Sequence, residues 1–282
     1  MGLINNIRKS YNRASFYISK PPFIYTYESI KNNLYITTNK YYKCPIPLPF
    51  MHKYGEYKAG IVPKIFHFIW VGSPIPAKYR DNISNLMTIN PNYKIILWVD
   101  CPSPGIRGVD LRLINKSEFI NEPYCNVFNN IVIKADLIRL ELVYKYGGIY
   151  SDVDVIAKKP LDDTFQKSFL CYEPHHYRDI GNGMFGLPAG DPLLCRCLQN
   201  FHIHMDWLKK NRSDLLESTA NNIACIAGGA YIMANLLSFN NLKEMLFINQ
   251  DYVISDTGFG FSHQTCDATW LPALKKASKL VK

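Results

Sequence analysis

One stretch of the chain predicts the fold most directly: Lys134-Ala-Asp-Leu-Ile-Arg-Leu-Glu-Leu-Val-Tyr-Lys-Tyr-Gly-Gly-Ile-Tyr-Ser-Asp-Val-Asp-Val-Ile156. Its first half carries apolar residues on nearly every side of a helix, so a largely buried helix is expected from about Asn129 to Tyr146. Gly147-Gly148 ends that helix, and the residues that follow predict a strand from Ile149 to Ile156. A buried helix that leads directly into a buried strand is typical of α/β folds.

Strands and helices alternate along the rest of the chain from Val62 onward. Further strands are expected at Lys64–Trp70, Tyr93–Val99, Ser168–Tyr172 and Gly183–Leu187, and further helices at Ala77–Ile89 and after Asp191-Pro192. This alternation predicts a mostly parallel central sheet flanked by helices, with ligands bound beyond the carboxyl ends of the strands. Residues 1–60, rich in Tyr and Pro, are expected to form an irregular extension that wraps a body formed by residues 61–282.

Composition restricts the class of protein. The 282 residues carry a formal charge of +9, contain no apolar run long enough to span a membrane and begin without a signal-peptide pattern. A cytoplasmic protein with scattered, reduced cysteines is the expectation from this pattern. The positive charge is compatible with peripheral contact with an anionic membrane, whereas no basic-aromatic motif of a nucleic-acid reader is present.

The pair Asp152 and Asp154 is the strongest chemical signal. On a strand, Tyr150 and both aspartates would share one face, which places the two carboxylates about 6 to 7 Å apart. Two such neighbours repel each other and are costly to desolvate, and a divalent cation relieves that conflict. Oxygen ligands suit Mg²⁺ or Mn²⁺, and an ion held there would neutralise a departing diphosphate.

The helix before that strand adds a second signal. Asp136 and Arg139 are three residues apart and therefore lie on one helical face. The pair is compatible with an internal ion pair that serves packing. Its position ahead of the acidic strand favours instead a role in binding, with Asp136 accepting hydrogen bonds from sugar hydroxyls and Arg139 holding the sugar or a phosphate oxygen.

Three blocks together resemble a known family. Pro63-Lys-Ile-Phe-His-Phe-Ile-Trp-Val-Gly72, Lys134-Ala-Asp-Leu-Ile-Arg139 and Tyr146-Gly-Gly-Ile-Tyr-Ser-Asp-Val-Asp154 are similar, in order and spacing, to the sugar-binding-region glycosyltransferases with a DXD motif. That family includes enzymes of the yeast initiating α-1,6-mannosyltransferase type and, more distantly, the clostridial glucosylating toxins. The resemblance implies a GT-A fold, a nucleoside-diphosphate-sugar donor, Mn²⁺ or Mg²⁺ and retention of anomeric configuration.

The resemblance also implies roles for individual residues. Trp70 would stack on the nucleobase beside the backbone of Ile69, and Tyr150 would lie near the donor sugar. The other implied roles place Asp136, Arg139 and Asp154 in catalysis, Asp152 and Trp270 on the nucleotide-sugar, Asn182 and Gly183 on the acceptor side, and Asp152, Asp154 and His263 at the metal.

The expected reaction is transfer of a hexose-type sugar from a UDP- or GDP-sugar to a glycan, a lipid-linked sugar or a protein. Two alternatives stay open on sequence alone. A metal-dependent nucleotidyl- or phosphotransferase uses paired aspartates in a similar way, and it would release pyrophosphate rather than nucleoside diphosphate. A non-catalytic nucleotide-sugar- or carbohydrate-binding protein of the same fold would turn over no donor at all.

Overall fold

The computed structural model describes residues 24–40, 54–128, 130–173, 179–216, 220–253 and 261–264. Trp270 and the basic clusters around residues 8–13 and 275–282 lie outside these ranges. The strands are β1 (Ile24–Tyr25), β2 (Tyr54–Glu56), β3 (Ile65–Trp70), β4 (Lys94–Val99), β5 (Asp110–Leu113), β6 (Gly148–Ser151), β7 (Val155–Ala157), β8 (Phe169–Tyr172), β9 (Ile180–Leu187), β10 (Phe239–Asn241), β11 (Leu246–Asn249) and β12 (Ser262–Gln264). The α-helices are α2 (Tyr27–Lys40), α3 (Ala77–Ile89), α4 (Glu122–Val127), α5 (Ile131–Tyr146), α6 (Pro192–Asn211), α7 (Ala220–Ile226), α8 (Gly229–Leu236) and α9 (Gln250–Val253), and short 3₁₀ turns lie at Lys116–Glu118, Asp163–Gln166 and Ser213–Leu216.

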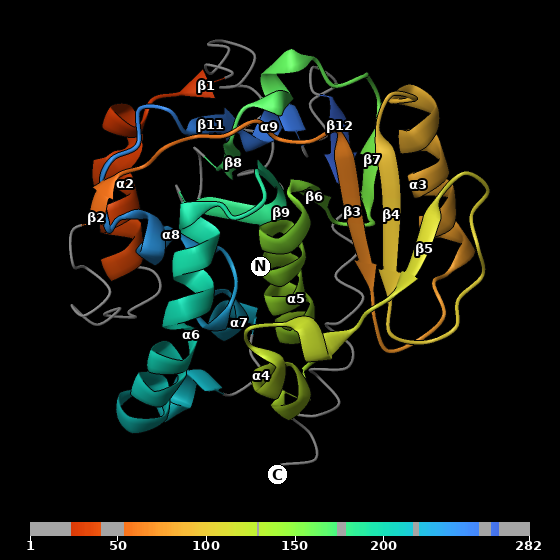
Figure 1. The fold of residues 1–282 in the computed structure, drawn as a ribbon. Coiled ribbons are helices and arrows are strands. Elements are labelled where there is room, and N and C mark those ends of the chain that lie inside the picture. Colours follow the sequence, from red (N-terminus) through yellow and green to blue (C-terminus); the bar gives the residue numbers. More distant parts are fainter. Residues whose placement is uncertain are drawn as a thin grey trace, which may run out of the picture.

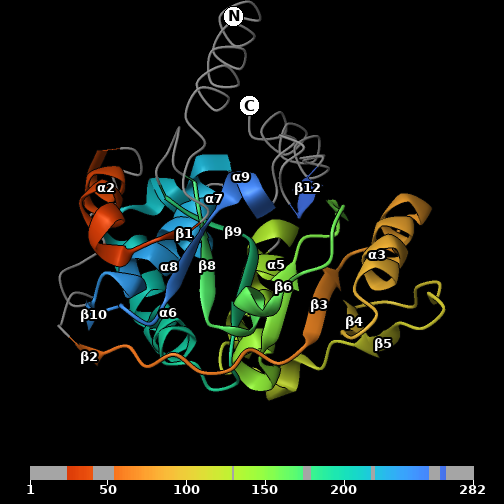
Figure 2. The ribbon, with the colours of Figure 1, turned by 90° about the horizontal axis from the view of Figure 1, so that it is seen from above.

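Eight strands form the central sheet, in the order β1-β11-β8-β9-β6-β3-β4-β5. The pairs β6–β3, β3–β4, β4–β5 and β11–β8 are parallel, whereas β9 runs antiparallel to both β6 and β8, and β1 runs antiparallel to β11. The predicted architecture, a mostly parallel sheet flanked by helices as in a GT-A fold, is confirmed. Figures 1 and 2 show β3, β4, β5 and α3 at one side of the molecule and α2, α6 and α8 at the opposite side.

Alternation along β3 explains why helices cover both faces of the sheet. Phe66 and Phe68 are buried in a cluster that includes the apolar side of α3, and Ile69 is buried in the other cluster, which includes α5, α6 and α8. Both faces of the strand are therefore buried, and its candidate binding residues Ile69 and Trp70 lie at its carboxyl end.

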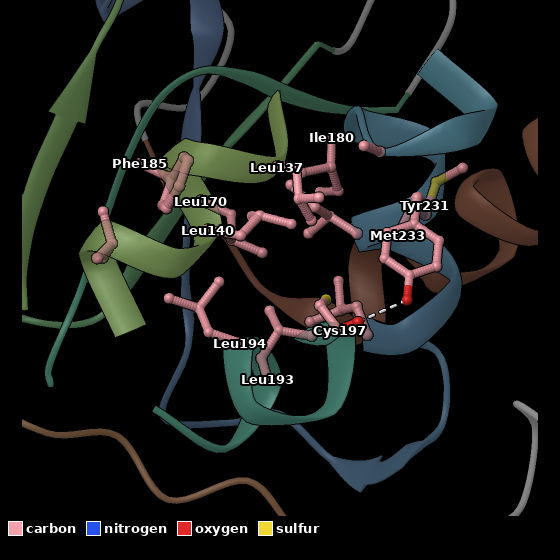
Figure 3. Close-up of a cluster of buried hydrophobic side chains, with 14 of the residues drawn as sticks. Leu137, Leu140, Leu170, Ile180, Phe185, Leu193, Leu194, Cys197, Tyr231 and Met233 are labelled. Carbon is pink, nitrogen blue, oxygen red and sulfur yellow. Dashed lines mark hydrogen bonds between the residues drawn. The ribbon is translucent and has the colours of Figure 1, made fainter. Parts of the chain in front are cut away.

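Helix α5 lies at the centre of the larger cluster. Its side chains Leu137 and Leu140 pack among residues of β9, α6 and α8, and the phenol of Tyr231 donates to the carbonyl of Cys197 at 2.6 Å beside them (Figure 3). Such burial on nearly every side is what the sequence predicts for this helix. Among the described residues, however, no helix reaches the combination of length and apolar character that crossing a bilayer requires.

The turn between α5 and β6 depends on two glycines. Gly147 and Gly148 have φ angles of 62° and 113°, a region of backbone space that favours glycine. A Cβ on Gly148 would also lie 2.6 Å from the carbonyl oxygen of Ile65 on the neighbouring strand. The Gly-Gly pair thus lets the chain pass from helix into sheet without a spacer, which fixes β6 directly beside β3.

The prediction of a single strand from Ile149 to Ile156 is wrong. Strand β6 ends at Ser151, residues 152–154 form a turn, and β7 then leaves the central sheet to pair with β12. The amide of Asp152 donates to the carbonyl of Gly183 at 2.8 Å, and the amide of Val155 donates back to the carbonyl of Asp152 at 3.2 Å. From helix α3, Asn82 donates to the carbonyl of Val153 at 3.0 Å. These bonds hold the acidic pair in a turn at the end of β6 rather than on a strand face.

Part of the first sixty residues packs against the body. Strand β1 forms one edge of the central sheet, and Tyr27, Ile30 and Leu34 of α2 are buried in the larger cluster. Further on, the Tyr57 phenol donates to the carboxylate of Asp191 at 2.5 Å. The division between an extension of residues 1–60 and a body of residues 61–282 remains a proposal.

Helix α6 begins as the sequence predicts. The side chain of Asp191 accepts hydrogen bonds from the amides of Leu193 and Leu194 at 2.8 and 3.3 Å, and Pro192 is the first helical residue. Burial raises the pKa of Asp191 to about 6, although these bonds act in the opposite direction.

Candidate functional site

Two charged residues of helix α5 form a buried pair at the carboxyl end of β6. Asp136 and Arg139 are 3% and 5% exposed, and a guanidinium nitrogen lies 2.9 Å from the Asp136 carboxylate. The i, i+3 spacing expected from the sequence therefore brings them together on one face. A buried ion pair costs desolvation energy, so its presence calls for partners beyond the pair itself.

Arg139 contacts three further site elements. It donates to the carbonyl of Asn182 at 2.6 Å, and its guanidinium lies over the ring of Tyr150 at 4.3 Å. It also lies 3.5 Å from the nearer carboxylate oxygen of Asp152. One cation thus links helix α5 with the ends of β6 and β9, which fixes their relative positions.

Asn182 joins the same network through its side chain. Its amide donates to Asp136 Oδ1 at 3.0 Å, so both its backbone and its side chain contact the Asp136–Arg139 pair. The resemblance placed Asn182 on the acceptor side; the structure places it directly beside the residues expected to bind the donor sugar.

Residues 152–154, which carry Asp152 and Asp154, form the acidic turn. Tyr150 and Asp152 connect the buried network to this turn. The Tyr150 phenol donates to Asp152 Oδ1 at 2.7 Å, the same oxygen that Arg139 approaches. Asp152 Oδ2 points to different neighbours, and its side chain is 28% exposed. One oxygen of Asp152 therefore serves the buried network, and the other faces the second aspartate.

Gln264 is the site residue that sequence reasoning missed. Its Nε2 donates to Asp152 Oδ2 at 3.1 Å and to Asp154 Oδ1 at 2.9 Å. The residue lies on β12, where it pairs with Val155 of β7, immediately after the acidic turn. The two carboxylates thus converge on a single point rather than turning toward bulk solvent.

Gly183 makes room for this arrangement. A Cβ at this position would lie 3.0 Å from Asp152 Oδ2 and 3.7 Å from the Gln264 amide nitrogen. Its carbonyl accepts the amide of Asp152 at 2.8 Å. The residue therefore shapes the acidic turn through its backbone and through the absence of a side chain.

Ile69 and Trp70 end strand β3, which pairs with β6. The Ile69 side chain is buried in the core, which leaves its backbone as the part available to a ligand. Trp70 is partly exposed, its indole donates to Ser73 Oγ at 3.2 Å, and its ring packs against Tyr79 with centroids 5.0 Å apart. Trp70 thus lies at the carboxyl end of the strand that pairs with β6, the strand that leads into the acidic turn.

The donor set at the acidic turn is compatible with a hard cation. Asp152 and Asp154 present one oxygen each to the same point, and carboxylate oxygens are the ligands that Mg²⁺ and Mn²⁺ prefer. Within the described residues, no three His, Cys, Asp or Glu side chains gather closely enough to hold a metal ion. The backbone of His263 lies in β12 beside Ile156, and its side chain lies outside what the structure describes, as does Trp270.

Burial and neighbouring charges shift the pKa values of Asp136 and Arg139 in opposite directions. Burial raises the pKa of Asp136 to about 6, against the opposing effect of Arg139. The pKa of Arg139 is raised above its usual range by Tyr150 and the surrounding carboxylates, although desolvation acts the other way. The carboxylates of Asp136, Asp152 and Asp154 all contribute to this rise.

The comparisons with known proteins agree with this geometry. Residues 76–170 match the family described as the glycosyltransferase sugar-binding region containing a DXD motif. The predicted resemblance is confirmed, and the match includes Asp136, Arg139, Tyr150, Asp152 and Asp154. It excludes the other site residues: Ile69, Trp70, Asn182, Gly183, His263, Gln264 and Trp270.

Individual relatives cover more of the chain. Inositol phosphoceramide mannosyltransferase 3 of Schizosaccharomyces pombe is 28% identical over 167 residues, covering 56% of this chain and 43% of that protein. Subversion of eukaryotic traffic protein A of Legionella pneumophila is 27% identical over 264 residues, covering 76% of this chain and 40% of that protein. The chain thus spans less than half the length of both. Among solved structures, PaToxG Glycosyltransferase aligns over 82% of this chain and 79% of its own, with a TM-score of 0.49 and 17% identity.

Proposed function

We propose that the chain transfers a hexose from a nucleoside-diphosphate sugar to an acceptor hydroxyl, with a divalent cation bound at Asp152 and Asp154. The observation that carries this proposal is the convergence of the two carboxylates on one point, at 3.1 and 2.9 Å from the same nitrogen. The turn that holds them lies within the matched sugar-binding region and at the carboxyl edge of the sheet.

The acidic turn would hold the cation between two residues of different character. Asp152 is fixed by Tyr150 through Oδ1 and offers Oδ2, while Asp154 offers Oδ1. A Mn²⁺ or Mg²⁺ ion held by these two residues would supply positive charge to a departing diphosphate. Two carboxylates that approach the same point repel each other, and a cation between them would relieve that repulsion.

The sugar would lie against the buried network on α5. Asp136 accepts from Asn182 and Arg139 and has remaining lone pairs, which suits hydrogen bonds to sugar hydroxyls. Arg139 holds Asp136, Asn182 and Tyr150 in place, so its role is to orient these groups and to add positive charge near the leaving phosphate. Such preorganised charge is commonly worth about 2.7 to 4 kcal/mol of barrier per removed donor.

The nucleotide would occupy the edge formed by β3 and β6. Trp70 would stack on the base beside the backbone of Ile69, and Trp270 would complete the nucleotide site from the C-terminal segment. A UDP- or GDP-linked donor and retention of configuration follow from the family resemblance. Retention requires no second carboxylate as nucleophile if the acceptor attacks from the face that the diphosphate leaves.

The acceptor proposed is a glycan, a lipid-linked sugar or a protein side chain. The S. pombe relative is named an inositol phosphoceramide mannosyltransferase, which puts GDP-mannose and an inositol-containing lipid first in a screen. Peripheral contact with an anionic membrane belongs to the same proposal, because the chain carries a formal charge of +9.

A product assay tests this function directly. The chain is incubated with UDP-glucose, UDP-galactose, UDP-N-acetylglucosamine or GDP-mannose in Mn²⁺, and the released nucleotide is identified. Release of nucleoside diphosphate by the wild type, and its loss in Asp154→Asn, is the expected result. Release of sugar 1-phosphate without nucleoside diphosphate would indicate nucleotidyl transfer instead. Saturable donor binding without turnover of any donor would indicate a binding protein.

A further inference from the structure

We infer that the side-chain oxygen of Gln264 is a third protein ligand of the cation site formed by Asp152 and Asp154. This inference rests on the proposed function and deepens it, because it assigns a ligand that lies outside the matched family region. It also replaces the expectation, drawn from the resemblance, that the neighbouring residue His263 is the third ligand.

The spacing of the three side chains carries the inference. One amide atom of Gln264 lies 3.1 Å from Asp152 Oδ2 and 2.9 Å from Asp154 Oδ1. An octahedral Mg²⁺ site has bonds of about 2.1 Å, so adjacent ligands in it lie roughly 3 Å apart. The Gln264 amide is therefore separated from each carboxylate oxygen by the distance that two adjacent ligands of one ion require.

Rotation of the amide converts a hydrogen-bond donor into a ligand. In the structure, Nε2 faces the carboxylates and donates to Asp152 Oδ2 and to Asp154 Oδ1. A half-turn about the last side-chain bond exchanges nitrogen and oxygen while the rest of the side chain stays in place. The oxygen would then repel the two carboxylates unless a cation lay among them, so the amide orientation follows the occupancy of the site.

The backbone around Gln264 is held by regular pairing. Strand β12 pairs antiparallel with β7, and the carbonyl of Phe261 accepts from the amides of Lys158 and Lys159 at 2.7 and 3.0 Å. The Phe261 ring packs edge-on against Phe165 with centroids 4.9 Å apart. Because β7 follows the acidic turn directly, this pairing ties Gln264 to the two aspartates at a fixed register.

The chemical consequence is an all-oxygen protein donor set. Two carboxylates and a neutral amide oxygen favour hard cations such as Mg²⁺ and Mn²⁺ over softer metals. A neutral third ligand also leaves more of the cation's charge for a diphosphate than a third carboxylate would. A site of this kind would bind the cation weakly in the absence of nucleotide and more tightly with it.

A Mn²⁺ titration of the full chain, followed by electron paramagnetic resonance without donor or acceptor, tests the inference. Gln264→Ala is expected to raise the Mn²⁺ dissociation constant by about tenfold or more. Gln264→Glu keeps an oxygen at the same place and adds charge, so it should bind Mn²⁺ at least as tightly as the wild type. Gln166→Ala is the matched control, because Gln166 also donates its amide to a carboxylate, that of Asp163, away from the site.

The Mn²⁺ dissociation constants of these variants either support or overturn the role of Gln264 as a ligand. An unchanged dissociation constant in Gln264→Ala, or weaker binding in Gln264→Glu, overturns the inference, as does loss of Mn²⁺ binding in His263→Ala alone. If Gln264→Ala does not fold, the Glu variant carries the test. The proposed function fails separately, if the wild type releases nucleoside diphosphate equally well in EDTA or turns over no donor while it still binds Mn²⁺.

Discussion

Two polar clusters lie on the α5 side of the sheet, and they differ in how their charges and hydrogen bonds are balanced. Around His67, Trp98 Nε1 donates to Nδ1 at 3.0 Å and Nε2 donates to the carbonyl of Gly147 at 2.8 Å, so both ring nitrogens are satisfied. Burial lowers the pKa of His67 to about 4, and the imidazole is therefore neutral. This cluster is closed and uncharged.

The cluster around Arg139 is different in both respects. The carboxylates of Asp136 and Asp152 lie 2.9 and 3.5 Å from the Arg139 guanidinium, and the Asp152 side chain remains 28% exposed. This cluster is charged and partly open to solvent. The difference teaches how a buried polar network that only holds the fold together can be distinguished from one built for a ligand: the second brings charged groups to a partly exposed position.

The largest effect is expected from replacing Arg139, whose guanidinium links the buried network. Arg139→Met keeps most of the side-chain volume but leaves Asp136 buried without its ion pair, which should cost about 3 to 5 kcal/mol of unfolding free energy. Urea denaturation followed by circular dichroism measures this loss. The double variant Asp136→Asn/Arg139→Met should recover part of it, and an equal loss in both variants would contradict the ion-pair explanation.

A substitution in the acidic turn should reduce sugar transfer and leave the stability of the fold nearly unchanged. Asp154→Asn removes one of two carboxylates that approach the same point, so the unfolding free energy should stay within about 0.5 kcal/mol of the wild type or rise. Sugar transfer should fall by about 100-fold or more. Release of nucleoside diphosphate and a thermal melt of the same sample check both statements. A matched loss of stability and activity would show that Asp154 serves the fold.

The contrast between these clusters also marks what the sequence could predict. The i, i+3 spacing of Asp136 and Arg139 and the Gly-Gly turn before β6 identify the site, because each is a local pattern with one geometric consequence. The break after Ser151 was missed because Val153, Val155 and Ile156 continue the composition of a strand. The turn is set instead by bonds from β9 and α3, which no local pattern reveals.

Gln264 was out of reach for a related reason. A lone glutamine carries no motif, and it lies 110 residues from Asp154 in the sequence. Only the pairing of β12 with β7 brings it to the acidic turn. In the same way, the hydrogen bonds of Asn182 to the Asp136–Arg139 pair depend on β9 running beside β6, an antiparallel neighbour within a sheet predicted only as mostly parallel.

A smaller effect is expected at the proposed nucleotide edge. Trp70→Ala should weaken donor binding by about 1 to 3 kcal/mol, the usual contribution of one aromatic stack on a base. Trp70→Phe keeps an aromatic face and should lose less. Calorimetry with UDP and GDP in Mn²⁺ measures the difference, and donor affinity equal to that of the wild type in the Ala variant would rule out the stacking role.

A substitution of His67 should reduce the stability of the fold and leave sugar transfer unchanged. His67→Phe leaves the Trp98 indole and the Gly147 carbonyl without partners, which should cost about 1 to 3 kcal/mol at pH 7 and leave transfer unchanged. The folded pKa of His67 is lowered, so the stability it contributes is present above about pH 6.5 and is lost as the pH falls toward about 4.

Because the pKa of His67 is lowered in the folded state, the stability difference between wild type and His67→Phe should depend on pH. Denaturation at pH 7 and pH 5 should show the gap between wild type and His67→Phe narrowing at pH 5 by about 2 kcal/mol, since each pH unit corresponds to about 1.4 kcal/mol. A gap that stays constant or widens at pH 5 would mean that the buried imidazole does not titrate in this way.

The proposed sugar transfer and the role of Gln264 both depend on the acidic turn being a cation site. Calorimetric titration of Mn²⁺ into the wild-type chain and into the double variant Asp152→Asn/Asp154→Asn tests this most directly. Saturable binding of a single ion by the wild type, strengthened by added nucleoside diphosphate and absent from the folded double variant, is the predicted result. Equal Mn²⁺ binding by both proteins, or none by the wild type even with nucleotide present, would contradict it.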